Sequence, residues 1–231
     1  MGQSRILNLP AKPRSRRTQA ERTAETRARI LEATVESLDQ VGFQRTTAAE
    51  ITRRAGVTWG AVQHHFESKD GVMRAVLEAS FDRFAGGLVD TFERLGPAAP
   101  LGERIGAFID SAWAHFASPD YRATFEILLE DSASRRAAPE QDDRSWQDEI
   151  FEGWTRVWCE LFPDVALERR RALMLQHYTI STLSGLASME VLAGHVTPFL
   201  PEELQLLKRT LATEFEAKTR EKGSKRKSFR D

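Results

Sequence analysis

Hydrophobic residues recur along most of the chain at the spacing of one face of an α-helix. In the segment from about 18 to 41, Ile30, Leu31, Val35 and Leu38 fall on one such face. No segment alternates as a strand does, and no internal repeat is visible. The pattern therefore predicts an all-α protein of about nine helices. The other eight are expected near 48–55, 59–66, 68–95, 101–117, 119–133, 144–162, 167–193 and 201–220.

The stretch from Thr47 to Phe66 predicts two short helices joined by a tight turn. Thr47 and Glu50 have the spacing of a capping box, in which each side chain accepts a hydrogen bond from a free amide at the helix start. Gly56 is expected to end the first helix, because glycine adopts the left-handed conformation at little cost. Thr58 is expected to cap the second helix. Two crossed helices of this kind are typical of a helix-turn-helix DNA-binding motif.

The side chains of these two helices divide into a buried set and an outward set. The residues expected to face a common core are Ile51, Ala55, Val57, Val62 and Phe66. The residues expected to point outward are Arg53, Arg54, Trp59, Gln63 and His64. A polar, partly basic outer face on the second helix suits contact with DNA.

The net charge of -1 conceals an uneven distribution along the chain. Residues 1–29 hold eight Lys and Arg against two acids, and residues 208–231 hold nine against four. The stretch between them carries a net charge of -12. We expect residues 1–17 to be a flexible basic arm and residues 222–231 to be a disordered basic tail. An acidic body with basic ends favours local contact with nucleic acid over coating of the whole surface.

Several classes of protein are disfavoured by the sequence. No apolar run approaches the roughly 20 residues of a membrane helix, and no apolar segment follows the basic N-terminus as in a secretion signal. The single cysteine, Cys159, excludes an internal disulfide framework and is expected to be buried and inert. No glycine-rich phosphate loop, serine nucleophile elbow or zinc spacing is present. We therefore expect a cytoplasmic protein that has no catalytic residues, metal or cofactor.

Residues 27–77 resemble the N-terminal domain of TetR-family transcriptional regulators. The matching motifs are Gly42-Phe43 after a long first helix, Ala55-Gly56-Val57 at the turn, Gly60 ahead of Phe66, and His64-His65-Phe66 followed by Ser68-Lys69. One departure is Gln63, where the family usually has an aromatic residue, mostly Tyr. A hydrogen bond from the Gln63 amide is the alternative to an aromatic packing contact with the DNA backbone.

The resemblance implies a DNA-binding domain over 18–84, with its second motif helix in the major groove and the basic arm on phosphates or in the minor groove. Gly60 either lets DNA approach the backbone closely or packs tightly against the first helix. His64 and His65 are not expected to share a metal ion, because adjacent helical side chains point about 100° apart. The expected DNA-binding residues are Thr46, Thr47, Thr58, Trp59, Gly60, Gln63, His64 and Lys69.

Aromatic residues are frequent in the segment 85–221, which the resemblance implies is an effector-binding and dimerisation domain. Aromatic side chains with a few polar partners can line a small-molecule pocket, although core packing is the alternative for each of them. The pocket candidates are Trp113, Phe116, Phe125, Trp146, Trp154, Trp158, His177 and Tyr178. His115, Tyr121 and Phe151 belong to the same group of side chains.

The helices near 167–193 and 201–220 correspond to the dimer interface of the family, and their small residues and leucine stripe suit close helix packing. The resemblance thus implies a homodimer that binds double-stranded DNA at a palindromic operator near the nucleoid. The expected function is that of a repressor released by a small-molecule effector. One alternative is a DNA-binding regulator that needs no ligand. Another is a helical small-molecule-binding protein whose helix-turn-helix is a relic.

Overall fold

A computed structural model describes residues 18–96, 98–137, 145–163, 165 and 167–227 of the chain. This part is all-helical, as predicted, and none of its helices is long and apolar enough to cross a membrane. The helices are α1 (Gln19–Val41), the 3-10 turn η1 (Phe43–Arg45), α2 (Ala48–Ala55), α3 (Trp59–Phe66), α4 (Lys69–Leu95), α5 (Leu101–Phe116), α6 (Pro119–Ala137), α7 (Ser145–Leu161), α8 (Arg169–Ala193) and α9 (Leu200–Lys227).

Two helices extend beyond their predicted ends. Helix α6 continues four residues past position 133, and α9 continues to Lys227. The prediction of a disordered tail is therefore wrong for residues 222–227. Gly223 does not end α9, because one glycine costs only about 1 kcal/mol in a helix whose other residues include many Glu, Lys and Arg. The predicted arm, residues 1–17, lies outside the described residues.

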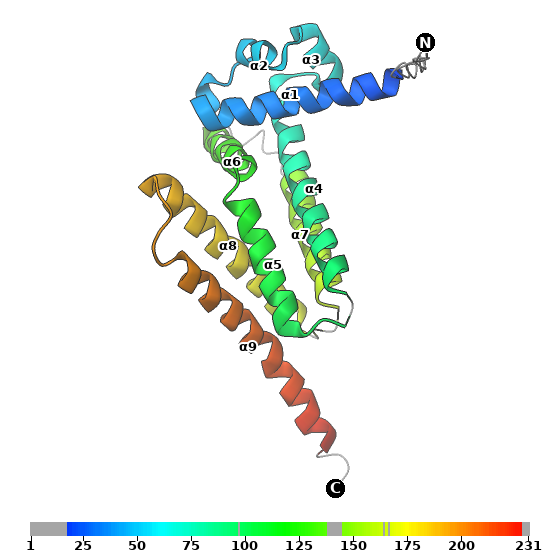
Figure 1. Ribbon diagram of the computed structural model, residues 1–231, viewed down its shortest axis with the longest axis vertical. Coiled ribbons are helices and arrows are strands. Elements are labelled where there is room, and N and C mark those ends of the chain that lie inside the picture. The colour runs from blue at the N-terminus through cyan, green and yellow to red at the C-terminus, as the bar shows by residue number, and fades with distance from the viewer. Residues whose placement is uncertain (1–17, 97, 138–144, 164, 166, 228–231) are drawn as a thin grey trace, which may run out of the picture.

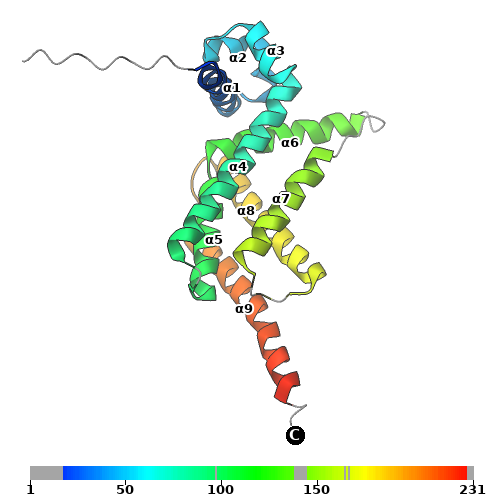
Figure 2. The same cartoon turned by 90° about the vertical axis from the view of Figure 1, so that its right-hand side faces the viewer.

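The molecule is elongated, with α1, α2 and α3 packed together at one end (Figure 1). Helix α4 starts in this N-terminal domain and runs for 27 residues, about 40 Å, into the second domain. Helix α6 lies across the base of the N-terminal domain where α4 leaves it (Figure 2). Helices α4 and α6 therefore both connect the N-terminal domain with the second domain.

The first hydrophobic core joins α1, α2, α3 and the first turns of α4. Ile30, Ile51 and Val62 are fully buried in it, as the sequence pattern predicted. Ala123 and Ile127 of α6 belong to the same core. The N-terminal domain therefore shares its core with a helix from the second half of the chain.

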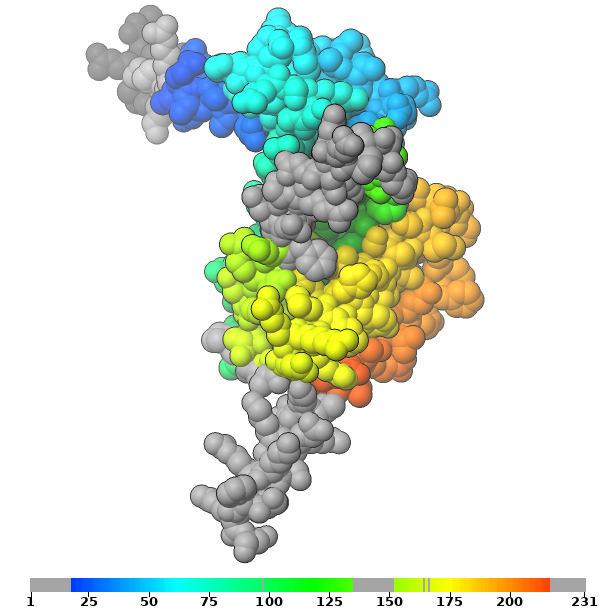
Figure 3. All heavy atoms as spheres, turned by 180° about the vertical axis from the view of Figure 1, so that it is seen from behind, coloured from blue at the N-terminus to red at the C-terminus, as the bar shows by residue number. Residues whose placement is uncertain are grey.

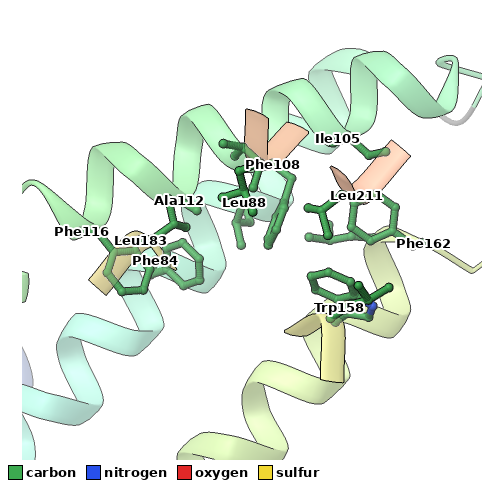
Figure 4. Packing of buried hydrophobic residues seen from close by; sticks show 14 of the residues in the cluster. Phe84, Leu88, Ile105, Phe108, Ala112, Phe116, Trp158, Phe162, Leu183 and Leu211 are labelled. Carbon is green, nitrogen blue, oxygen red and sulfur yellow. The ribbon is translucent and has the colours of Figure 1, made fainter. Parts of the chain in front are cut away.

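The second core fills the space between the lower half of α4 and helices α5, α7, α8 and α9. Figure 4 shows its aromatic centre, where Trp158 packs edge-on against Phe108 with ring centroids 5.5 Å apart. The ring centroid of Phe162 lies 5.4 Å from that of Trp158 and 5.1 Å from that of Phe215. Trp158, a pocket candidate, is thus a core residue of this domain, with 5% of its surface exposed.

Candidate nucleic-acid interface and ligand cavity

The turn between α2 and α3 is fixed by three local features that the sequence predicts. Thr47 Oγ1 accepts a hydrogen bond from the Glu50 amide at 3.2 Å, and Thr58 Oγ1 accepts one from the Ala61 amide at 3.3 Å. Gly56 is left-handed at φ 63° and ψ 39° and ends α2. These caps satisfy amide groups that the helix starts leave free. The helix-turn-helix prediction is confirmed.

Glu50 stabilises the motif through ion pairs and not through the predicted capping box. Its carboxylate pairs with Arg53 at 2.7 Å and with Arg54 at 2.5 Å, and these hydrogen bonds lower its pKa to about 2. Arg54 also donates to Gln40 of α1 at 2.8 Å and is largely buried, with 11% of its side chain exposed. The prediction that Arg54 points outward is therefore wrong, because it ties α2 to α1.

The outer face of α3 is open to solvent at the positions expected to meet DNA. Thr58, Gly60, Gln63 and His64 are exposed, and Trp59 is half-buried against the first core. A Cβ atom added at Gly60 would meet only Thr58 Oγ1, at 3.9 Å. Tight packing of Gly60 against α1 is therefore excluded, and close approach of DNA at this position stays a prediction.

Thr46 cannot be a DNA contact as predicted. Its side chain is fully buried, and its hydroxyl lies 2.9 Å from Ser37 Oγ and 2.9 Å from the Gly42 carbonyl oxygen that accepts from it. The neighbouring Thr47 is exposed at the start of α2. The hydroxyl of Thr46 fastens the α1–η1 corner, and only Thr47 remains available to a phosphate group.

Lys69, at the first position of α4, is half-buried. Its Nζ lies 4.6 Å from the centroid of the Phe43 ring, a cation–π contact that holds the ammonium near the α2–α3 face. Arg27 of α1 is a structural residue that the sequence did not indicate. It donates to the His65 carbonyl at 3.3 Å and lies over the Phe66 ring, so that it clamps α3 to α1.

A cavity of about 430 Å³ lies between α4, α5, α6, α7 and α8. Phe116, Phe125 and Trp154 line it, as predicted from the sequence. The lining residues that the structure describes are Leu77, Ser80, Phe81, His115, Phe116, Tyr121, Thr124, Phe125, Leu128, Leu129, Trp154, Ile180 and Ser184.

The other pocket candidates lie elsewhere. Trp113 packs against the second core, and His177 and Tyr178 are exposed on α8. The side chain of Trp146 lies outside the described residues. Trp158 is in the second core, as described above. None of the four candidates whose side chains are described lines this cavity, and Trp158 lines a second cavity of about 290 Å³ beside α7 and α8. The sequence pattern does not distinguish these cases, because cavity-lining, core and surface side chains can all recur at helical spacing.

The cavity wall holds a small number of polar groups. Tyr121 Oη of α6 and Ser184 Oγ of α8 are 2.6 Å apart and hydrogen-bonded. Ser80 is buried, and its hydroxyl has no hydrogen-bond partner among the described residues. Burial lowers the pKa of His115 to about 4; Asp120 opposes this shift and Arg83 adds to it. His115 is therefore a neutral imidazole at pH 7.

Gly153 of α7 sets the position of one wall. A Cβ atom at Gly153 would lie 2.7 Å from Cζ of Phe81, so the Phe81 ring rests directly on the α7 backbone. Phe81 in turn lies 6.2 Å from the Trp154 ring by centroid distance. The glycine thereby leaves room for two aromatic rings at one end of the cavity.

In the part of the chain that the structure describes, the side chains form no site for metal binding or for cysteine chemistry. No group of three or more His, Cys, Asp or Glu there could hold a metal ion. The rings of His64 and His65 are arranged edge-to-face at 5.2 Å. Cys159 is exposed, which corrects the prediction that it is buried, because it lies on the face of α7 that points away from the second core.

Helix α6 makes polar contacts with the DNA-binding end on the side away from the cavity. Arg122 Nη2 lies 2.8 Å from Asp39 Oδ1 of α1, and Glu130 accepts from the Gln44 side chain at 3.1 Å. Between them, the partly buried Glu126 accepts from the Phe43 backbone amide, and burial raises its pKa. Three side chains one turn apart thus attach α6 to the α1–η1 corner.

Helices α8 and α9 lie side by side on one face of the molecule (Figure 3). Eight of the ten large hydrophobic side chains exposed in the described residues belong to the segment 174–206. They are Met174, Tyr178, Met189, Val191, Leu192, Val196, Phe199 and Leu206. A patch of this kind on a protein surface marks an interaction site.

Comparison with known proteins agrees with this geometry. Residues 30–76 match the family model for bacterial regulatory proteins of the tetR family. An uncharacterized HTH-type transcriptional regulator of Mycobacterium tuberculosis is 48% identical over 59 residues, which are 26% of this chain and 30% of that protein. The regulator BetI of Escherichia coli is 26% identical over 123 residues, 48% of this chain and 63% of BetI. The chain thus spans less than two thirds of these relatives.

The fold of the whole chain has solved counterparts. The structure of tylP, a TetR regulator from Streptomyces fradiae, superposes with a TM-score of 0.58 at 24% identity, covering 84% of this chain and 88% of that one. The architecture and the α2–α3 motif define a two-domain, all-helical helix-turn-helix protein. Residues 30–76 thus match the family model of the tetR regulators, and the chain shares the fold of a solved TetR regulator.

Proposed function

We propose that this chain is a homodimeric, DNA-binding transcriptional repressor that binds a palindromic operator and is released by a small-molecule effector. The observation that carries the proposal is the outer face of α3. Its exposed Thr58, Gly60, Gln63 and His64 stand on a capped helix, and no described residue packs over them. Because the proposed operator is part of the nucleoid, a protein with this function would be located in the cytoplasm.

Each exposed group of this face has a role in DNA binding. Gln63 can form a paired hydrogen bond to an adenine in the major groove, and the Trp59 ring can cover a thymine methyl group. Gly60 permits close approach, since its Cα has open space outside. Thr47 and Lys69 can bind phosphates and fix the orientation of α3 without reading sequence.

The exposed apolar face of α8 and α9 supports a homodimer. One α3 helix contacts few base pairs, and a two-fold pair of them doubles the site and makes it palindromic. The outward side chain of Leu192 is 80% exposed, and a second copy of the same face would cover it. In the dimer the two α3 helices must be about one DNA turn apart, roughly 34–36 Å, or a small multiple.

Effector release follows if a ligand in the cavity favours another separation of the α3 helices. Helix α4 contributes Ser80 and Phe81 to the cavity, and its first turns pack in the DNA-binding core. Helix α6 contributes Tyr121 and Phe125 and contacts α1. A ligand that binds the DNA-incompetent arrangement more tightly would weaken operator binding. The loss in operator binding free energy is limited by the difference between the ligand's binding free energies to the two arrangements.

Selection of bound duplexes from a random pool tests the DNA-binding proposal. We expect enrichment of a palindrome whose half-sites are about one helical turn apart, centre to centre. The matched control is Gln63→Ala together with Lys69→Ala, which we expect to remove the enrichment while the helical circular dichroism is unchanged. Absence of enrichment by the unmodified protein at every salt concentration would overturn the proposal, and would favour a helical ligand-binding protein with an unused motif.

A further inference from the structure

The described lining of the cavity between α4 and α8 carries no charge. Of these thirteen residues only His115 can ionise near neutral pH, and burial holds the pKa of its imidazole at about 4. The two charged groups that act on His115, Arg83 and Asp120, pair with each other at 3.0 Å and are not part of the described lining. A charged ligand would therefore lose its hydration shell without gaining an opposite charge, at a cost of several kcal/mol.

The walls of the cavity are formed largely by flat aromatic rings. The Trp154 ring lies 4.5 Å from Phe84 by centroid distance, and the rings of Tyr121 and Phe125 are stacked with planes 26° apart. His115 adds a neutral ring 5.8 Å from Tyr121. Ring planes in these orientations offer offset-stacked and edge-on contacts to a planar ligand.

One polar group on this wall lacks a partner. Ser80 is 2% exposed, and its hydroxyl makes no hydrogen bond to any described residue. Serine hydroxyls in helices commonly bond to the carbonyl four residues earlier, as Ser188 does to Ser184 at 2.8 Å, so the unpaired state of Ser80 is unusual. A buried polar group without a partner destabilises the ligand-free protein, and a ligand acceptor would remove that cost.

We infer that the cavity takes an uncharged, aromatic ligand that carries a hydrogen-bond acceptor such as a carbonyl oxygen, and that Ser80 donates to this acceptor. The inference rests on the proposed function, in which the occupant of this cavity is the effector. It deepens that proposal by assigning the chemical class of the ligand and the residue that selects it.

Four naphthalenes of similar shape separate charge from hydrogen bonding. They are 2-acetylnaphthalene, 2-ethylnaphthalene, 2-naphthoate and 2-naphthylmethylammonium, each titrated calorimetrically into the full chain at pH 7. We expect the ketone to bind most tightly, and the carboxylate and the ammonium to bind at least about tenfold more weakly because of desolvation. Equal or tighter binding of either ion would overturn the inference, and so would failure of all four to bind.

Ser80→Ala tests the assigned donor. We expect binding of the ketone to weaken about fivefold, the effect of one neutral hydrogen bond, while binding of 2-ethylnaphthalene stays the same. We also expect the thermal midpoint of the ligand-free variant to rise, because the unpaired hydroxyl is gone. The matched control is Ser37→Ala, whose buried hydroxyl is bonded to Thr46 and whose loss should lower the midpoint. Equal weakening of both ligands by Ser80→Ala would contradict the donor role.

The affinity for operator DNA, measured in the same ligand solutions, distinguishes failure of the proposed ligand class from failure of the proposed effector role. Selective binding of the ketone without any change in operator affinity would support the ligand class and contradict the effector role. Release of the operator by 2-naphthoate but not by the ketone would support the effector role and contradict the ligand class.

Discussion

Tyr121 and Arg122 are consecutive residues of α6 that bond to different domains, Tyr121 to α8 and Arg122 to α1. The Tyr121 hydroxyl lies 2.6 Å from Ser184 Oγ beside the cavity, and Arg122 Nη2 lies 2.8 Å from Asp39 on α1. One turn of helix thus contacts both the ligand cavity and the DNA-binding domain. A displacement of Tyr121 by a ligand would therefore act on a helix turn that is bonded to α1.

Removing the Arg122–Asp39 ion pair should weaken the coupling between ligand binding and operator binding. We expect Arg122→Ala to reduce the factor by which 2-acetylnaphthalene lowers operator affinity, measured by fluorescence anisotropy. Its effect on stability should be at most about 1 kcal/mol, because the ion pair is partly exposed. The control is Lys208→Ala, which removes a 2.6 Å ion pair between α9 and α5 that does not touch α1. An unchanged factor in Arg122→Ala would show that α6 does not carry the signal.

His115 makes stability depend on pH in a defined window. Its folded pKa of about 4 lies below its ordinary value of 6.5, so the unfolded chain takes up the proton first as pH falls. Stability is therefore full above pH 6.5 and decreases toward pH 4, by on the order of 3 kcal/mol.

We expect His115→Phe to remove this slope in urea unfolding measured from pH 7 to pH 4. His177→Phe, at an exposed position of α8, controls for the loss of one histidine. A slope that persists in His115→Phe and disappears in His177→Phe would contradict the assignment.

Gly60 should show opposite effects on folding and on DNA binding. Ala has the higher helix propensity, and its Cβ atom would meet no tight contact, so Gly60→Ala should raise the free energy of unfolding by about 0.5 kcal/mol. The same methyl group should weaken operator binding by obstructing the approach of DNA. Gly102→Ala, also at the second position of a helix and in open space, should stabilise without affecting operator binding. Unimpaired operator binding by Gly60→Ala would show that DNA does not approach there.

Gln63 and Lys69 should contribute to DNA binding in different ways. We expect Gln63→Ala to reduce the difference in affinity between the selected site and random duplex, because Gln63 is exposed on the face of α3 that is proposed to contact bases. We expect Lys69→Ala to weaken both equally and to lower the slope of log affinity against log salt by about one. The measurement is a salt titration with both duplexes. If each variant weakens both duplexes equally, the assigned roles are wrong.

Leu192 should be part of the dimer interface. We expect Leu192→Asp to produce monomers in sedimentation velocity at micromolar concentration and to weaken operator binding strongly, because a charge would be placed in an apolar interface. Val89→Asp is the matched control, since Val89 is an exposed apolar residue of α4 outside the patch on α8 and α9. A dimer that survives Leu192→Asp would locate the interface elsewhere.

Local structure could largely be predicted from the sequence. The cap at Thr47, the left-handed Gly56 and the cap at Thr58 each depend on residues at most four apart. The neighbours Thr46 and Thr47 show the limit of such prediction. Both are threonines at a helix start, and only the packing of α1 against η1 decides that Thr46 is buried.

The cavity could be predicted only in part, because its lining comes from five helices. Phe116, Phe125 and Trp154 belong to the aromatic set found in the sequence. Ser80 gave no signal, since a serine in a helix is usually solvent-exposed, and its burial depends on how α4 packs in the folded domain. Trp158 has the same sequence pattern as Trp154 but lies one turn further along α7, inside the second core.

The contact between Gly153 and Phe81 bears on how such a protein diverges. A methyl group at Gly153 would lie within 3 Å of the tip of the Phe81 ring and would push that ring toward the cavity. A single codon change could therefore reduce the size of the accepted molecule while every residue that touches it stays the same. Descendants of one ancestral gene could acquire different inducers through a residue that no comparison of binding-site positions would include.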